Sequence, residues 1–373
     1  MLFDTFLDFM ESWPSKWKDF DGYNVTEDMV RRSYSKYILE PDDFLNLLSP
    51  CAKNYLEDMA QRAHNIRLRH FGRAVNIFTP LYISDFCTNQ CRYCGFNAKN
   101  IQKRRHLSIE EVYLEAQFIA SQGFKHILLL TGEAKNIASI EYIVEVVRKI
   151  KPLFSSIGIE IYSVSTEEYK LLVEAGVDSM TMFQETYDAK LYDWLHPVGP
   201  KKDYVFRLTA PERAAKAGMR FLGIGALLGL NNFISDAFAT AMHAWWLQQK
   251  FQSIDISVSI PRICDHEGEF EVKHGLDDVE LVQYVIALRL FLGSIGITCS
   301  SRESSFMRDH LIPLGVTRVS AGVSTAVGGR VTENWNNKGQ FEINDHRSLR
   351  EMVSDLSSIG YQAVMKDWED PSQ

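Results

Sequence analysis

Basic residues are fewer than acidic ones in this sequence, and that shortage excludes one class of partner. Forty lysines and arginines stand against 48 aspartates and glutamates, which gives a formal net charge of −8 over 373 residues. A protein that neutralises nucleic-acid phosphates needs a basic surface instead. We therefore expect no nucleic-acid partner.

Long apolar runs are also missing. No stretch approaches the roughly 18 consecutive apolar residues that indicate a membrane-spanning helix. The N-terminal segment carries Asp4, Asp8 and Glu11 and has no basic region ahead of an apolar core, as a secretory leader would. We expect a cytoplasmic protein with no membrane contact, in a compartment where thiols stay reduced.

Short segments rich in β-branched residues alternate with longer amphipathic segments, which predicts parallel βαβ units. The predicted strands are 75–83, 126–131, 158–163, 179–184, 220–227, 255–261, 297–301 and 317–321. The predicted helices lie near 108–121, 138–150, 166–175, 208–217, 235–250, 278–292, 304–311 and 346–358. Eight such units favour an α/β fold of the TIM type, a (β/α)8 barrel, over a doubly wound open sheet.

The pattern also divides the chain into three parts. Residues 1–74 are expected to form an N-terminal helical extension, and residues 75–322 the barrel. Residues 323–373 are expected to hold a long surface loop at 328–345, a last helix and a tail. Ser108 with Glu111 forms a capping-box pattern, and Gly123, Gly176 and Gly218 mark the ends of helices.

Three of the six cysteines lie close together, at Cys87, Cys91 and Cys94, just after the first predicted strand. Thiolates suit iron–sulfur clusters and zinc. A structural zinc normally takes four protein ligands, and no fourth Cys or His stands at a matching spacing. Three thiolates on a 4Fe–4S cube leave one iron open to a small molecule, as a catalytic cluster requires. Structural zinc and buried free thiols also fit the three cysteines and stay open here.

The remaining cysteines are isolated in the sequence. Cys51, Cys264 and Cys299 are expected to be packed as small apolar residues rather than to bind metal.

The spacing CxxxCxxC, with Tyr93 before its last cysteine, resembles the radical S-adenosylmethionine (SAM) superfamily. The resemblance implies that the cluster binds and cleaves SAM. It also implies a (β/α)8 barrel with the cysteines at the carboxyl ends of the strands, where barrel enzymes have their active sites.

The same resemblance implies a set of residues that bind SAM. The turn Thr131-Gly132-Glu133 is similar to the superfamily's Gly-Gly-Glu turn, which holds the methionyl ammonium, although Thr131 departs from it. Glu185 matches the carboxylate that accepts hydrogen bonds from the ribose hydroxyls. Arg207 matches the arginine that pairs with the methionyl carboxylate. Gly223 and Gly225 match positions in the superfamily where the backbone of the fifth strand lies under the adenine ring.

Further segments narrow the resemblance to the aromatic amino-acid lyase branch, and most of all to the 2-iminoacetate synthase family. They are 80–84, 93–96, 130–133, 183–187, 301–304 and 366–368. This implies a tyrosine lyase that cleaves the Cα–Cβ bond of L-tyrosine. The products would be 2-iminoacetate (dehydroglycine) for the thiazole of thiamine, p-cresol, 5′-deoxyadenosine and methionine.

Residues for the substrate are expected on the last strands. Arg302 is our candidate for the tyrosine carboxylate, and a barrel-rim salt bridge to Glu303 or Asp309 is the competing interpretation. Ser320 is a candidate for a further hydrogen bond to the substrate, and Tyr82 and Gln184 are expected either to line the pocket or to belong to the core. His196 and Lys201 are expected in a loop that contacts either the phenol or the solvent.

Three more functions are compatible with the sequence. The tyrosine lyase of diiron-hydrogenase maturation has a C-terminal extension with more cysteines, and this sequence has no cysteine after Cys299. A tryptophan lyase of the same branch is the second, and a non-catalytic iron–sulfur scaffold is the third. The resemblance also implies partners: a thiazole synthase, and flavodoxin or ferredoxin as the electron donor.

Overall fold

The computed structural model describes residues 3–13, 17–18, 20–263, 270, 272, 274–331 and 339–365. Cys264 and the segment 366–368 lie outside these residues. Across the described part of the chain, each helix is too short or too polar to cross a lipid bilayer.

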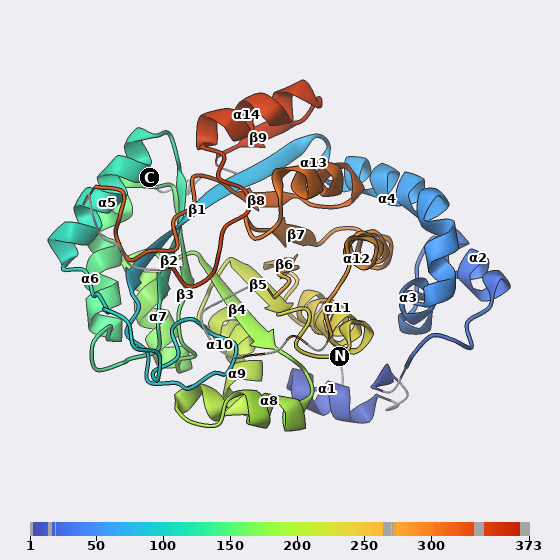
Figure 1. Cartoon of the computed structure of the whole chain (residues 1–373), viewed down its shortest axis with the longest axis horizontal. Coiled ribbons are helices and arrows are strands. Elements are labelled where there is room, and N and C mark those ends of the chain that lie inside the picture. Colours follow the sequence, from blue (N-terminus) through green and yellow to red (C-terminus); the bar gives the residue numbers. More distant parts are fainter. Residues whose placement is uncertain are drawn as a thin grey trace.

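Eight parallel strands close into a barrel surrounded by helices, which confirms the predicted fold (Figure 1). Neighbouring strands pair in the order β2-β3-β4-β5-β6-β7-β8-β1, and a further pairing of β1 with β2 closes the ring. The strands are β1 (Ala74–Ser84), β2 (His126–Thr131), β3 (Ser156–Glu160), β4 (Ser179–Glu185), β5 (Phe221–Ala226), β6 (Asp255–Ser259), β7 (Gly296–Cys299) and β8 (Arg318–Ser320).

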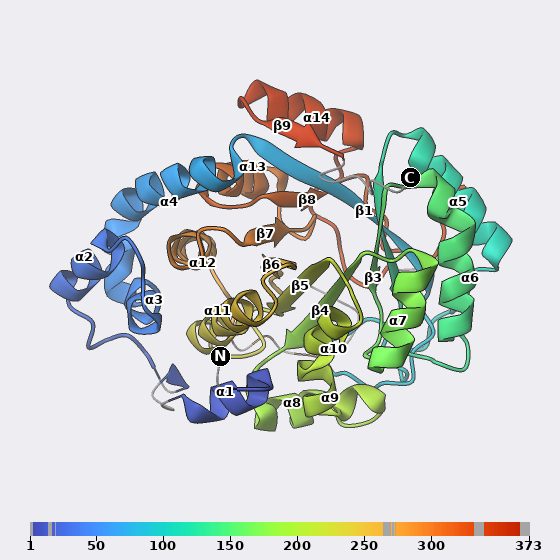
Figure 2. The same cartoon turned by 180° about the vertical axis from the view of Figure 1, so that it is seen from behind.

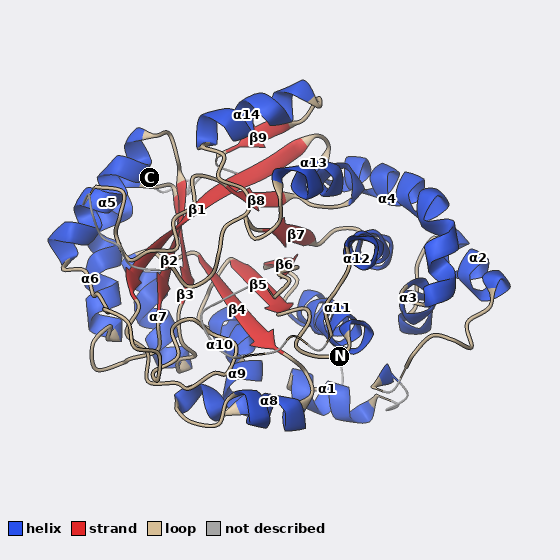
Figure 3. Cartoon of the chain, viewed as in Figure 1, coloured by secondary structure: helices blue, strands red, loops and turns tan. Residues whose placement is uncertain are grey.

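Helices follow the strands and cover the outside of the barrel (Figure 3). They are α5 (Ile109–Ser121), α6 (Ile140–Ile150), α7 (Thr166–Ala175), α8 (Ala189–Leu195), α9 (Tyr204–Leu208), α10 (Ala210–Lys216), α11 (Phe233–Lys250), α12 (Asp278–Phe291), α13 (Ser305–Leu314) and α14 (Leu349–Ser358). The Ser108–Glu111 capping box is present. Gly123, Gly176 and Gly218 all have positive φ, as helix-ending glycines do. The short helices α8 and α9 fall where the sequence predicts no helix.

The N-terminal residues form helices that pack on one side of the barrel's outer layer. These are α1 (Phe6–Ser12), α2 (Glu27–Ser35), α3 (Pro41–Leu47) and α4 (Leu56–Phe71). Helices α3 and α4 lie against α11, α12 and α13 (Figure 2). Phe44 stacks on Phe291 with ring centroids 5.0 Å apart, and Phe6 stacks on His243 at 4.0 Å. These contacts join the extension to the barrel through buried aromatic side chains.

A ninth strand, β9 (Gln362–Val364), lies where the sequence predicts only a tail. It pairs in parallel with residues 74–76 of β1, outside the closed ring. Strand β1 is long enough to pair with β8, β9 and β2 along different parts of its length.

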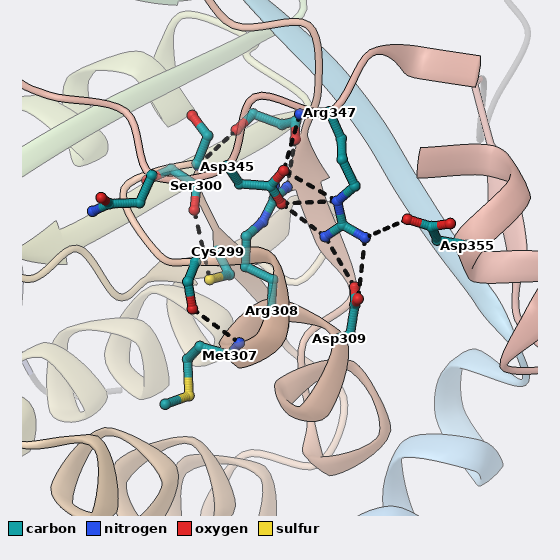
Figure 4. A network of polar contacts seen from close by, with 12 residues as sticks. Cys299, Ser300, Met307, Arg308, Asp309, Asp345, Arg347 and Asp355 are labelled. Carbon is teal, nitrogen blue, oxygen red and sulfur yellow. Dashed lines mark hydrogen bonds and ion pairs between the residues drawn. The ribbon is translucent and has the colours of Figure 1, made fainter. Parts of the chain in front are cut away.

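The predicted loop 328–345 has no helix or strand in its described part, which turns back over the barrel and is held there by ion pairs. Asp345 is buried and pairs with Arg308 of α13, which also donates a hydrogen bond to the carbonyl of Ser320 (Figure 4). Arg347 binds Asp345 at 2.7 Å and Asp355 of α14 at 2.9 Å. This ion-pair network fixes the segment between two helices.

Asp345→Asn should lower the free energy of unfolding by about 3 kcal/mol or more, because it leaves the buried Arg308 guanidinium without its carboxylate. Asp355→Asn is the matched control. The Asp355 side chain is 49% exposed, so its loss should cost less than about 1 kcal/mol. Urea unfolding followed by circular dichroism measures both values. Equal losses in the two variants would contradict the assigned importance of the buried pair.

Candidate active site

The interior of the barrel holds a large cavity that opens at the carboxyl ends of the strands. Its empty volume is about 1340 Å³, counting the mouth. Its lining joins Cys94 of the cysteine loop to Arg302, which follows β7. Seven predicted site residues lie on its wall: Tyr82, Tyr93, Cys94, Glu185, Gly223, Arg302 and Ser320.

The three cysteines lie on the loop that follows β1, and their thiols are free. Burial raises the pKa of Cys91 to about 12 and also raises the pKa of Cys94. Ligation by iron therefore has to displace the thiol protons. Side-chain amides approach two of the sulfurs, since Asn89 Nδ2 is 3.6 Å from Cys87 Sγ and Gln340 Nε2 is 3.9 Å from Cys94 Sγ. Hydrogen bonds to the sulfurs are one of the means by which proteins tune iron–sulfur clusters.

Zinc receives no support from this arrangement. Among the residues that the structure describes, no three Cys, His, Asp or Glu side chains stand close enough together to hold a single metal ion. Thiolates that hold a cube bind different irons and need not converge on one point. Three free cysteine thiols on one loop are the donor set that a 4Fe–4S cluster with one open iron requires, so Cys87, Cys91 and Cys94 fit such a cluster.

The cysteine loop is fastened to the turn after β2. Thr88 donates two hydrogen bonds to the carbonyl of Glu133, from its backbone N–H at 2.9 Å and from its hydroxyl at 3.0 Å. Gly132 meets the loop so closely that a Cβ atom there would lie 2.4 Å from the carbonyl oxygen of Phe86. Asn89 Nδ2 donates to Glu133 Oε2 at 2.7 Å. The predicted Thr131-Gly132-Glu133 turn therefore lies directly beside the cysteines.

Glu185 ends β4 in a strained conformation and carries two cationic partners. Its φ of 70° is the one positive value among the non-glycine residues that the structure describes. Lys201 Nζ lies 2.6 Å and Arg207 Nη2 3.5 Å from Glu185 Oε1. Burial alone would raise the pKa of Glu185, but the charges of Lys201 and Arg207 outweigh it and hold the pKa below its usual value.

Two residues whose surroundings the sequence leaves open, His196 and Lys201, are largely enclosed by the protein. His196 is fully buried, and its Nδ1 lies 2.7 Å from the carbonyl of Tyr192, so its Nε2 accepts a hydrogen bond from the Tyr93 hydroxyl at 2.8 Å. Burial, helped by Lys201, lowers the pKa of His196 to about 3. His196 is thus a neutral support for Tyr93, and neither it nor Lys201 lies in solvent.

The glycines of β5 stand where the neighbouring strands leave no space for a side chain. A Cβ atom at Gly223 would lie 2.7 Å from Thr181 Oγ1, and one at Gly225 would lie 2.7 Å from the carbonyl of Ser259. Gly223 lines the cavity. Any side chain larger than hydrogen would therefore force the wall of β4 or β6 to move.

Arg302 lines the cavity and stacks its guanidinium on Phe341, 3.4 Å from the ring centroid. The competing interpretation, a rim salt bridge of Arg302, does not match the described residues, because Glu303 pairs with Arg262 and Asp309 pairs with Arg347. The Tyr82 hydroxyl donates to Gln340 Oε1 at 2.9 Å.

Ser320 and Gln184 complete the predicted substrate residues. Ser320 Oγ accepts the backbone N–H of Ser301 at 3.0 Å and lies on the cavity wall. Gln184 is buried at a register shift of β4 between two wall residues, Phe183 and Glu185. Both polar atoms of its side-chain amide are buried without a hydrogen-bond partner among the described residues, and its place in the substrate site stays a prediction.

Several wall residues are absent from the sequence-based prediction. Glu160 at the end of β3 is one, and Gln340 and Phe341 are two more. The position of Glu160 after Ile159 at a strand's carboxyl end is a usable signal, since barrel enzymes place active-site residues there. The sequence holds no such signal for Gln340 and Phe341, which come from an irregular segment.

Comparisons with known proteins agree with this geometry. Residues 81–236 match the model of the radical SAM superfamily, and residues 259–362 match the Biotin and Thiamin Synthesis associated domain. A solved FeFe-hydrogenase maturase is similar in structure, with a TM-score of 0.85 and 31% identity, covering 94% of this chain and 78% of that one. A methylornithine synthase shares the fold, with a TM-score of 0.71 and 23% identity over 90% of this chain and 97% of that one.

Two curated relatives align over almost their whole length. The 2-iminoacetate synthase of Salmonella typhimurium is 36% identical, and that of Escherichia coli 35%, each over 96% of this chain and 97% of the relative. The chain therefore belongs to the radical SAM superfamily, whose members use a 4Fe–4S cluster and S-adenosylmethionine, and within it to the family of the 2-iminoacetate synthases.

Proposed function

We propose that this enzyme is a carbon–carbon lyase that cleaves L-tyrosine into 2-iminoacetate and p-cresol, with formation of 5′-deoxyadenosine and methionine from SAM. The observation that carries the proposal is a single cavity that has Cys94 of the cluster loop and the guanidinium of Arg302 on its wall. An amino acid held by its carboxylate at Arg302 would lie in the same enclosed space as the cofactor.

The alignment with relatives favours this reaction over hydrogenase maturation. The chain covers 97% of each of the two 2-iminoacetate synthases but only 78% and 79% of two hydrogenase maturases. A tryptophan lyase is a second candidate within the same branch, and the identity of the phenolic or indolic product separates the two.

Cys87, Cys91 and Cys94 would hold three irons of the cluster and leave the fourth to SAM. When bound, the cluster supplies the electron that divides SAM into methionine and a 5′-deoxyadenosyl radical. The protein's own contribution is to hold SAM in place and keep water out of the cavity. Tyr93, supported by His196, closes the wall beside the cysteines.

The turn after β2 and the end of β4 would hold the polar parts of SAM. Glu133 would pair with the methionyl ammonium of SAM through charge-assisted hydrogen bonds. Gly132 and Thr131 would shape the turn that carries it. Glu185 would accept hydrogen bonds from the ribose hydroxyls. Arg207 would bind the methionyl carboxylate through two N–H groups of its planar guanidinium. Gly223 and Gly225 would leave room for adenine. Thr131 Oγ1 is buried without a hydrogen-bond partner in the described residues.

Arg302 would bind the tyrosine carboxylate, with Ser320 and Tyr82 on the same wall. Beyond this cavity we propose a thiazole synthase as the acceptor of the unstable imine, and flavodoxin or ferredoxin as electron donor, in the cytoplasm. We also propose that the chain is divided into a helical extension (1–74), a barrel (75–322) and a C-terminal part (323–373).

Anaerobic incubation of the reconstituted enzyme with L-tyrosine, SAM and a reductant tests the reaction. Chromatography should find p-cresol and glyoxylate, the hydrolysis product of the imine, in amounts that follow 5′-deoxyadenosine. Formation of 5′-deoxyadenosine without p-cresol would reject tyrosine as the substrate and keep the radical chemistry. Skatole-type products from tryptophan would favour the second candidate.

Cys91→Ala should lose the cluster and with it all cleavage of SAM, because one iron loses its thiolate. Iron and sulfide content, and 5′-deoxyadenosine formed without tyrosine, are the measurements. Cys51→Ala is the matched control, since Cys51 is a free thiol outside the cluster loop. A Cys91→Ala enzyme with full iron content and normal SAM cleavage would refute the ligand assignment.

Arg302→Gln should raise the KM for tyrosine by about tenfold to a hundredfold, because a hydrogen bond to a charged group contributes about 1.5–3 kcal/mol. Cleavage of SAM in the absence of tyrosine should stay near the wild-type rate. Arg350→Gln, on the exposed face of α14, serves as the control. A raised KM for SAM rather than for tyrosine would move Arg302 to the cofactor site.

A further inference from the structure

Two charged side chains face the cavity without a hydrogen-bonded partner. Within the described residues, Glu160 and Arg302 both line the cavity, and neither carboxylate nor guanidinium forms a hydrogen bond or ion pair with another side chain. The other charged residues of the wall have partners. Glu185 forms ion pairs with Lys201 and Arg207, and Arg318 Nη2 lies 2.7 Å from His126 Nδ1. The cavity therefore offers one acidic and one basic group to a ligand.

Glu160 lies inside the barrel, and part of its surface is nevertheless exposed. It is the last residue of β3 and pairs in register with Leu130 of β2, another wall residue. Its partial exposure is exposure to the cavity. A carboxylate that is removed from bulk water and left without a partner is costly, and such groups occur mostly where a ligand completes them.

The two carboxylates of the cavity are in opposite electrostatic environments. Burial raises the pKa of Glu160 to about 7, with Arg302 opposing and Glu185 reinforcing the rise, and Arg207 and Lys201 opposing it more weakly. Glu185, held by its two cations, has a lowered pKa instead. Pairs of acids separated in this way commonly have different tasks in one site.

We propose that Glu160 binds the α-ammonium group of the amino-acid substrate and accepts one of its protons. This inference rests on the proposed function, in which Arg302 binds the α-carboxylate of the same molecule. An α-amino acid carries one positive and one negative group on the same carbon, and the cavity carries the complementary pair of free charges.

The chemistry of the product requires such a proton transfer. In 2-iminoacetate the nitrogen forms a C=N double bond, but in the ammonium form its electron pair is engaged in an N–H bond. Transfer of that proton to Glu160 breaks one N–H bond, forms one O–H bond and returns the electron pair to nitrogen. The step consumes no electron and needs no further reactant. The amine is then neutral before the Cα–Cβ bond breaks.

The remaining carboxylates near the cavity are poorer candidates for this base. Glu185 is tied to two cations that favour its charged form and weaken it as a proton acceptor. Glu133 is not on the cavity wall and already accepts a hydrogen bond from Asn89. A base whose pKa lies near the working pH is the most effective, and Glu160 is that group here.

Glu160→Gln and Glu160→Asp test the proposal, with Glu167→Gln as a matched control at the start of α7. In the reconstituted holoenzyme, Glu160→Gln should form p-cresol about 10²-fold more slowly at pH 7. The Kd for SAM and the tyrosine-independent formation of 5′-deoxyadenosine should stay within about twofold of the wild type, since a general base for the substrate takes no part in SAM cleavage. Glu160→Asp, which keeps the acid, should recover part of the rate, and Glu167→Gln should match the wild type.

The pH profile and one analogue give independent readouts. For the wild type, kcat/KM for tyrosine should rise with pH through a value near the pKa of Glu160, because the base must be ionised, and the variant Glu160→Gln should lose that rise. The probe 3-(4-hydroxyphenyl)propanoate, which lacks the ammonium, should inhibit the wild type and Glu160→Gln equally, while tyrosine binding weakens in the variant.

Two outcomes would overturn the proposal. One is an unchanged rate and pH profile of p-cresol formation in Glu160→Gln. The second is a parallel loss of SAM binding and SAM cleavage, which would assign Glu160 to the cofactor. Failure of the proposed function looks different, because the wild-type enzyme itself would then form 5′-deoxyadenosine and no p-cresol.

Discussion

The close contact between the cysteine loop and the turn after β2 is the constraint on which the site depends. Gly132 has no room for a side chain, because the carbonyl of Phe86 occupies the place of its Cβ. Thr88 and Asn89 fasten the loop to the backbone and carboxylate of Glu133. The cluster ligands are therefore placed relative to a barrel strand, not relative to a free loop. Precision of this kind is what a cavity shared by a cofactor and a substrate requires.

The end of β4 is also held in place by its neighbours, but there the backbone is strained. A non-glycine residue with positive φ, such as Glu185, is strained, and here a register shift of the strand accompanies it. Asp236 supports the following turn by accepting hydrogen bonds from the Thr186 hydroxyl and the Tyr187 N–H. The carboxylate lies on the cavity side of the strand with Thr181 and Phe183, where Lys201 and Arg207 hold it.

The barrel and the cluster loop can be predicted from the sequence because both depend on local patterns. Eight alternating segments and the spacing of Cys87, Cys91 and Cys94 need no knowledge of distant residues. Strand β9 is not predicted, because three residues are too few to show the alternation of polar and apolar side chains that indicates a strand. Gln340 and Phe341 reach the cavity from far along the chain, and only tertiary packing brings them there.

The ion-pair network of the C-terminal segment extends to the substrate side of the cavity. Arg308 and Arg347 hold Asp345, and the chain just before Asp345 carries Phe341 against the guanidinium of Arg302. Stacking on a ring occupies the face of a guanidinium and leaves the N–H donors in its plane free. Phe341 therefore orients Arg302 without using the groups that bind a carboxylate. A salt bridge would have oriented Arg302 too, but it would have neutralised the charge that a zwitterionic substrate needs.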